Sequence, residues 1–304
     1  MQSLILNFTQ SIFPIVLVVL TGYLLRRWRP LDPKQVGHIA FNIMLPTLIF
    51  REVYISNLKL EDSFKMFGLT IILLAVLLAC GWILGTVVKA SYTQRTAMTI
   101  TVAFMNCGAL GLSVNEFAFG SDALAWAGIF FLTVIVLMTV FGVYIAEAGR
   151  MSTTNAVKQL FKVPMIYAVG AAFLAKAIQI EIPAVLMRPI NLTASGAVPI
   201  VLILLGIQIA ETGIPKNWGL VGLITCASLV LSPIIAFGLA QLIGMQGLPL
   251  KVAVLQAGMP LAVLNGVIAT EYDLEPELVA SAILISTLLS PITLSILLSA
   301  LNSF

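Results

Sequence analysis

Long runs of apolar residues, separated by short polar or Pro- and Gly-containing stretches, make up most of the chain. A helix needs about 20 apolar residues to cross a bilayer, so each run of that length predicts one membrane-spanning helix. The pattern therefore predicts an all-α polytopic membrane protein with ten spans, at about 4–25, 35–54, 65–89, 95–119, 122–146, 161–180, 190–211, 217–243, 251–270 and 278–302.

Polar residues and helix breakers interrupt three of these runs, at 95–119, 190–211 and 251–270. MNCGALGLSVNE, from Met105 to Glu116, places an Asn, a Cys and two Gly residues inside the first, and LQAGMPLAVLNG lies inside the third. At ~1.5 Å per residue, both interruptions fall near the middle of the bilayer. Non-helical backbone is tolerated at that depth only where it is buried in protein or lines a cavity.

Each half of the chain carries a proline at a corresponding position within an apolar run. FNIMLPTLIF carries Pro46, and SGAVPIVLILLGIQIA carries Pro199, 153 residues later. The same offset moves the interruption at 106–111 onto 259–264, inside the other interrupted run. Each half, 1–150 and 151–304, then holds five spans. Because five is odd, the second half enters the membrane from the opposite face, and the pattern predicts two inverted five-helix repeats.

Inverted repeats with a broken helix at corresponding positions are typical of secondary transporters, in which the broken helices meet near the midplane and form the binding site. A half-helix that begins at a break offers free N–H groups and the positive end of its dipole. The amide side chains of Asn106 and Asn265 add donors without the cost of a buried charge. The breaks therefore predict a site for an anion such as a carboxylate.

Composition and charge agree with a membrane protein. Of 304 residues, 60% are hydrophobic and only 10% are charged, and the mean hydropathy is +1.07. The net charge of +3 is small, and the basic residues lie in short loops, which argues against a nucleic-acid partner. The first apolar run lacks a secretory cleavage site, so we expect its helix to be retained. All three cysteines, Cys80, Cys107 and Cys226, fall in apolar runs, so no disulfide framework is indicated.

Lys and Arg residues in the loops give the predicted orientation. We expect ten on the cytoplasmic side: Arg26, Arg27, Arg29, Lys34, Lys89, Arg95, Arg150, Lys158, Lys162 and Lys216. Six fall on the other side: Arg51, Lys59, Lys65, Lys176, Arg188 and Lys251. Both termini are therefore expected outside.

Four stretches resemble the bacterial branch of the auxin efflux carrier family, which includes carriers assigned to malate and malonate. They are FNIMLPTLIF, MNCGALGLSV, AVPIVLILLGIQIAE and QAGMPLAVLNGVIA. The resemblance implies a multi-pass protein of the bacterial inner (cytoplasmic) membrane, with ten helices in two inverted repeats and an architecture similar to bile acid sodium symporters. It implies crossed fourth and ninth helices at the substrate site. It also implies a scaffold from helices 1, 2, 6 and 7, and a transport domain from helices 3–5 and 8–10.

The family motifs map onto the two interrupted runs. In the fourth helix they correspond to Asn106, Gly108 and Gly111, and in the ninth to Met259, Pro260 and Asn265. This chain departs from the family at two positions, with Ser113 in place of a proline and Ala109 in place of a second asparagine, which favours a smaller or less polar substrate. The candidate substrate-binding residues are Asn106, Cys107, Gly108, Gly111, Ser113, Gly258, Met259, Pro260 and Asn265.

Each candidate also has a structural interpretation. Gly108 and Gly111 are alternatively contact points between packed helices. Asn106 and Asn265 alternatively bridge backbone carbonyls freed at the breaks, and Cys107 is alternatively a small packing residue.

The sequence shows no Asp, Glu or Lys near the midplane of a span, where a charge would cost at least ~2.5 kcal/mol. It therefore does not support proton coupling through a buried carboxylate. We expect no cofactor. Sodium coupling through backbone carbonyls at the breaks stays open, as does transport driven by the membrane potential alone.

The leading hypothesis is a secondary transporter that moves a small organic anion, such as a dicarboxylate or an auxin-like acid, by alternating access. We expect no enzyme, because an intramembrane serine protease needs a histidine base near Ser113 and His38 is the only histidine. A channel or a sensor subunit on a transporter-like fold stays open as an alternative. Lipid-facing scaffold helices are compatible with a homodimer.

Overall fold

The computed structural model covers the chain and describes residues 13–29, 31–55, 60–138, 164–211 and 217–302. Within these ranges it is all-helical, without strands, apart from one isolated bridge between two extended residues. The α-helices are α2 Phe13–Trp28, α3 Pro33–Ile39, α4 Leu45–Ile55, α5 Leu60–Val87, α6 Tyr92–Ala103, α7 Ala109–Phe119, α8 Asp122–Leu137, α11 Pro164–Ala177, α12 Ala184–Ser195, α13 Ala197–Glu211, α14 Trp218–Cys226, α15 Ser232–Leu242, α16 Gly247–Ala257, α17 Leu264–Glu271 and α18 Pro276–Leu301.

Helices make up most of the described part of every predicted span, which confirms the all-helical fold class. Among the described residues, four helical stretches are long and apolar enough to cross a membrane: Glu61–Val87, Ala184–Ala210, Trp218–Leu242 and Pro276–Leu301. The predicted spans that contain the interruptions at 105–108 and 258–263 are each divided into two shorter helices. The boundary predicted near residue 150 lies outside the described residues.

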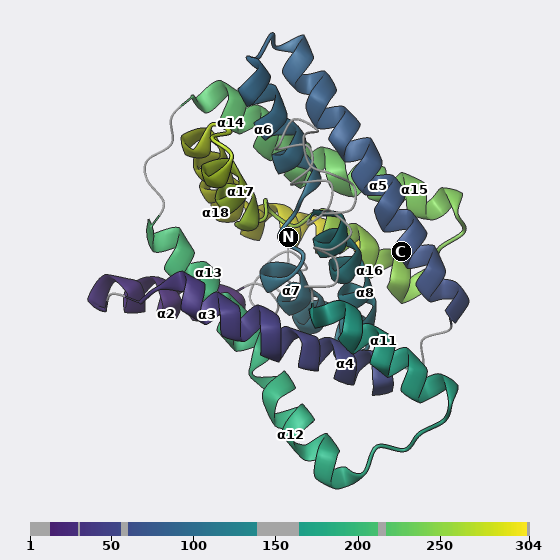
Figure 1. Ribbon diagram of the computed structural model, residues 1–304. Coiled ribbons are helices and arrows are strands. Elements are labelled where there is room, and N and C mark those ends of the chain that lie inside the picture. The colour runs from purple at the N-terminus through teal and green to yellow at the C-terminus, as the bar shows by residue number, and fades with distance from the viewer. Residues whose placement is uncertain (1–12, 30, 56–59, 139–163, 212–216, 303–304) are drawn as a thin grey trace.

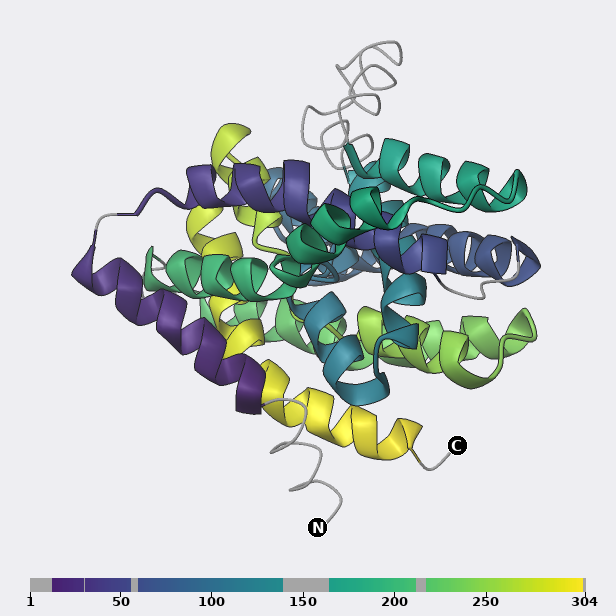
Figure 2. The same ribbon diagram turned by 90° about the horizontal axis from the view of Figure 1, so that it is seen from below.

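The helices pack in two groups (Figures 1 and 2). In the first, α2 packs along α13, while α11 and α12 pack against α4. In the second, α5 packs against α6 and α8, and α15, α16 and α18 complete the layer beside them. Contacts of α7 with α13 and of α4 with α8 join the groups. The broken helices therefore lie where the two groups meet.

Two glycines allow α2 and α13 to approach closely. A Cβ on Gly206 would lie 1.9 Å from the carbonyl oxygen of Val19, and one on Gly22 would lie 2.1 Å from that of Ile203. Small residues at a crossing let helix backbones pack together in a membrane, where dispersion contacts replace the hydrophobic driving force. This contact holds α2 against α13, whose other residues line the cavities described below.

The helices that carry Pro46 and Pro199, α4 and α13, also meet. Pro46 is the second residue of α4. Pro199 lies in the first turn of α13, where a missing N–H costs no hydrogen bond within that helix. A π-helical turn, Ala40–Met44, precedes α4, and Gly196 separates α12 from α13. A Cβ on Gly196 would lie 2.5 Å from Met44 Cε, so the two segments are packed in direct contact.

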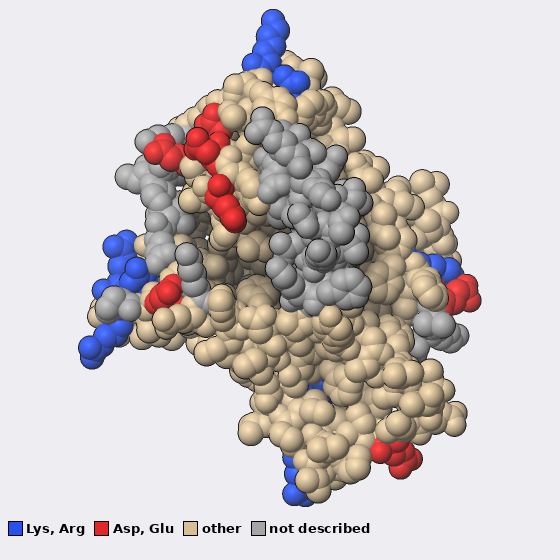
Figure 3. Space-filling view, viewed as in Figure 1, with Lys and Arg blue, Asp and Glu red and all other residues tan. Residues whose placement is uncertain are grey.

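Charge and apolarity on the surface fit a protein surrounded by lipid. In Figure 3 the charged side chains form small separate clusters, several at the rim of the view and one acidic group further in, and most of the described surface between them is uncharged. Large apolar side chains are exposed on several helices, among them Leu20 on α2, Ile83 on α5 and Ile292 on α18. Exposed apolar area of this extent is rare on soluble monomers and typical of a membrane-facing surface.

Candidate functional site

Two extended segments cross where the predicted interruptions lie. The N–H of Asn106 donates to the Pro260 carbonyl at 2.6 Å, and the N–H of Ala262 donates to the Phe104 carbonyl at 3.0 Å. These two bonds form the isolated antiparallel bridge in the fold. They satisfy peptide groups that would otherwise be unpaired far from water. The structure thus brings the two predicted breaks into direct contact.

Neighbouring helices hold the second break by side-chain hydrogen bonds. The N–H of Leu261 donates to Ser286 Oγ on α18 at 3.3 Å. The Oγ of Ser228 donates to the Met259 carbonyl at 3.3 Å. The Nδ2 of Asn265 donates to the carbonyl of Phe104 at 2.8 Å, from one break to the other. Asn265 therefore bridges a freed carbonyl, as its structural interpretation proposed.

A cavity of about 90 Å³, here called the crossover cavity, is lined by both breaks and by both packing groups. Its lining residues are Phe41, Met105, Asn106, Cys107, Gly108, Ala109, Phe131, Val134, Ile135, Met138, Leu204, Gln208, Ala262, Val263, Leu264 and Val267. The first residues of α7 and α17 are both among them. The N-terminal ends of two half-helices therefore meet at one cavity, the arrangement that the sequence predicted for an anion.

Unpaired donors lie at this cavity. Asn106 is only 7% exposed, and its Nδ2 has no hydrogen-bond partner. The N–H groups of Gly108, Ala109 and Leu110, at the start of α7, have no backbone acceptor in the described part of the chain. Buried donors are nearly always satisfied, so unpaired donors on or next to residues that line a cavity are candidates to bind an acceptor ligand.

The other predicted residues lie away from the cavity wall. A Cβ on Gly111 would lie 2.0 Å from Oε1 of the buried Gln256, and one on Gly258 would lie 2.5 Å from Leu297 Cδ2. Both glycines are close-packing positions. Ser113 Oγ donates to the Ala109 carbonyl at 2.7 Å, within its own helix.

Of the nine candidates, three line the crossover cavity: Asn106, Cys107 and Gly108. The remaining six support the crossing or pack around it.

A second cavity, here called the Arg51 cavity, lies further along the same helices and was not predicted. It has a volume of about 350 Å³ and is lined by Val18, Leu48, Arg51, Glu116, Phe117, Ala194, Ser195, Val198, Pro199 and Leu202. On α7, Ala109 lines the crossover cavity and Glu116 lines this one. On α13, Gln208 lines the crossover cavity and Leu202 lines the Arg51 cavity. The two cavities therefore follow one interface, at successive depths.

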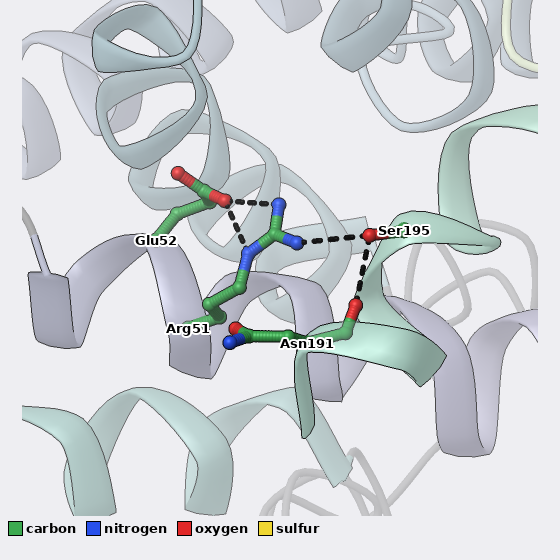
Figure 4. Close-up of polar contacts among 4 residues, drawn as sticks. All are labelled: Arg51, Glu52, Asn191 and Ser195. Carbon is green, nitrogen blue, oxygen red and sulfur yellow. Dashed lines mark hydrogen bonds and ion pairs between the residues drawn. The ribbon is translucent and has the colours of Figure 1, made fainter. Parts of the chain in front are cut away.

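An ion pair adjoins the Arg51 cavity (Figure 4). Arg51 Nε donates to Glu52 Oε1 at 2.6 Å, and Arg51 Nη2 pairs with the same oxygen. Glu52 is only 3% exposed. Glu52 is therefore a buried carboxylate inside α4, near the end of the predicted span at 35–54, and it was not among the residues singled out from sequence. Two adjacent charged residues between apolar ones, in IFREVYI, were the signal that could have identified it. The expectation that no Asp, Glu or Lys lies near the midplane of a span stays a prediction.

No group of three or more His, Cys, Asp or Glu side chains that could hold a metal ion is found among the described residues. The sodium site considered from sequence, made of backbone carbonyls, is not tested by that observation. It stays a prediction.

Comparison with known proteins agrees with these features. The family described as "Membrane transport protein" matches residues 7–298. An uncharacterized transporter of Methanothermobacter thermautotrophicus is 27% identical over 300 residues, covering 94% of this chain and 96% of its own. A protein of Rhizobium meliloti described as "Putative malonate transporter" is 28% identical over 313 residues, covering 97% and 96%. An uncharacterized transporter of Methanocaldococcus jannaschii is 25% identical over 296 residues, covering 93% and 95%.

The family and these relatives are named as transporters, which agrees with the expectation that the protein is not an enzyme. The family match covers both breaks, the crossover cavity and nearly the whole chain. The chain therefore belongs to the membrane transport protein family, the auxin efflux carrier family that its motifs resemble.

Proposed function

We propose that this protein is a secondary transporter that binds a small organic anion in the crossover cavity and moves it across the cytoplasmic membrane by alternating access. One observation carries the proposal: the N-terminal ends of α7 and α17 and the unpaired amide of Asn106 line the same cavity. Helix N-termini and neutral donors stabilise a carboxylate through partial charges, without a buried counter-ion.

A small carboxylate is the proposed substrate class. The cavity volume of about 90 Å³ suits a molecule of few atoms, and apart from Asn106 and Gln208 its lining side chains are apolar or small. The Rhizobium relative adds malonate as the first compound to test, because its description names that dicarboxylate. A larger acid would require the cavity to widen as the helices move.

The proposed architecture has ten helices in two inverted repeats, with a scaffold and a moving transport domain. The packing of α2, α4, α11, α12 and α13 with one another supports a separate scaffold. The contacts of α5, α6 and α8 with each other, and of α16 with α15, α18 and α8, support a second body.

The two cavities support alternating access along the scaffold interface. With both termini outside, as the loop charges favour, the crossover cavity lies toward the cytoplasm and the Arg51 cavity toward the outside. Movement of α7 and α17 relative to α4 and α13 would open one side and close the other.

Uptake by purified protein in liposomes tests this function. We expect saturable, protein-dependent uptake and counterflow of radiolabelled malonate or another small carboxylate, with Na⁺, H⁺ and voltage gradients imposed separately. Flux that rises linearly with concentration and carries current without saturation would instead indicate a channel. If no carboxylate in a broad panel moves under any gradient, the proposal is wrong.

A further inference from the structure

The Arg51 cavity contains more negative than positive charge. Arg51 and Glu116 line it, and the Glu52 carboxylate is paired with Arg51 beside it. Glu116 forms no ion pair in the described ranges, and its electrostatic neighbours are Glu52 and Arg51. One guanidinium therefore lies near two carboxylates, of which Glu52 is buried and Glu116 is half-buried, and an uncompensated charge is costly where water is partly excluded.

Other charged groups on the helices packed against α4 and α7 do not restore the balance. They are Asp122 on α8, Lys176 on α11, Arg188 on α12, Glu211 on α13 and Lys251 on α16. Asp122 acts on Glu52 by repulsion, which adds to the excess of negative charge. The Nζ of Lys176 donates to the Val53 carbonyl at 3.2 Å. Arg188 is exposed.

The remaining donors of Arg51 are weakly occupied. Its Nη1 approaches Ser195 Oγ at 3.4 Å, a long contact, and that hydroxyl already donates to the Asn191 carbonyl at 2.8 Å (Figure 4). A guanidinium has five N–H donors in a planar fork. Arg51 therefore has donors that Glu116, on the opposite wall of the same cavity, can engage if that wall moves.

We propose that Arg51, Glu52 and Glu116 form a proton site that couples anion transport to the proton gradient. A proton from solvent forms an O–H bond with the Glu116 carboxylate and so removes one negative charge from the cavity. It leaves as a proton to the opposite side after the interface has moved. A proton requires only one carboxylate oxygen, whereas a metal cation would meet the repulsion of the Arg51 guanidinium. The inference rests on the proposed transport function.

The position of Glu116 links the proton to the substrate. Glu116 and Ala109 lie on the same helix, seven residues apart, which is about 10 Å along the axis. Ala109 lines the crossover cavity, and Arg51 lies across the interface on α4. When Glu116 is ionised, its attraction to Arg51 holds α7 against α4. Protonation removes that attraction, so α7 can move with its anion.

Accumulation at equilibrium in liposomes tests the proton site. The membrane potential is clamped near zero with potassium and valinomycin, and the probe is the radiolabelled carboxylate that shows counterflow, with malonate first. One proton per anion predicts that a tenfold inward proton gradient gives up to about tenfold accumulation in wild type. Glu116→Gln is expected to retain counterflow, but its inside-to-outside concentration ratio at equilibrium is expected to stay at about one. Glu116→Asp keeps the carboxylate and is expected to restore part of the accumulation.

The control is Glu271→Gln, which changes an exposed carboxylate at the end of α17. It is expected to accumulate like wild type. Accumulation in Glu116→Gln equal to wild type would overturn the inference, as would accumulation driven by a sodium gradient at constant pH. Should Glu116→Gln not fold, Glu52→Gln is measured in the same way with the same expectation. Absence of counterflow in wild type would count against the transport function itself and not against the proton site alone.

Discussion

Replacing Asn106 by Asp is expected to abolish carboxylate uptake. The Nδ2 of Asn106 is buried without a partner at the crossover cavity, so it is available to a ligand carboxylate. Asp has nearly the same shape, but it replaces a donor by a negative charge within contact of the anion. A hydrogen bond to a charged group contributes ~1.5–3 kcal/mol, so Asn106→Ala alone should lower the uptake efficiency by about 10- to 100-fold. Asn106→Asp adds charge repulsion and should lower it further.

The comparison is made on initial uptake rates in liposomes containing equal amounts of folded protein. Asn42→Ala is the matched control, because Asn42 is exposed and its Nδ2 donates only to the His38 carbonyl, one turn away. It should transport like wild type. If Asn106→Asp transports normally while remaining folded, the anion does not bind at this amide.

Adding one methyl group at Gly206 is expected to disrupt the fold. In Gly206→Ala the new Cβ would lie 1.9 Å from the Val19 carbonyl oxygen and 2.7 Å from the Tyr23 nitrogen. Both are backbone atoms of α2, so no side-chain rotation relieves the overlap. The helices must separate, and the loss of packing should lower the free energy of unfolding by about 3 kcal/mol. Thermal unfolding in detergent, followed by intrinsic fluorescence, measures the effect.

Gly170→Ala is the control for this change. Gly170 also lies within a helix, α11, and a Cβ there meets nothing within 4 Å. Its melting temperature should stay at or slightly above the wild-type value, because alanine favours a helix more than glycine does. Equal melting temperatures for the two variants would show that α2 and α13 are not in the contact described.

The positions of the two breaks could be predicted from sequence because their residues conflict with an apolar span. Polar and helix-breaking residues are unfavourable in the middle of the bilayer unless they pair with freed backbone groups or bind a ligand. One apolar run contains Asn106 and Gly108, and another contains Gly258 and Pro260. The shared register of the two interruptions then indicated that they form a pair. The hydrogen bonds between Phe104 and Ala262 and between Asn106 and Pro260 are consistent with that interpretation.

Which residues reach the cavity could not be predicted, because that depends on packing between distant helices. Gly108 and Gly111 belong to the same interrupted stretch, and nothing in the sequence distinguishes their roles. In the structure Gly108 lines the crossover cavity, whereas Gly111 packs on Gln256. Phe41 and Gln208 complete the cavity from segments outside the two breaks, and neither was among the residues predicted to line it. Glu52 was missed because a charge near the end of a span is normally assigned to the interface, whereas here other helices cover it.

Side-specific labelling of a cysteine in the crossover cavity tests the central claim most directly. Ala109→Cys is introduced after the three native cysteines have been replaced, in a protein confirmed to transport, and a negatively charged thiol reagent is added to either side of oriented vesicles. If access to the cavity alternates, the reagent reaches the cysteine introduced at position 109 from one side at a time, and the transported carboxylate slows the reaction in proportion to its occupancy. Equal labelling from both sides at once, or labelling unaffected by a saturating carboxylate, would contradict the proposed function.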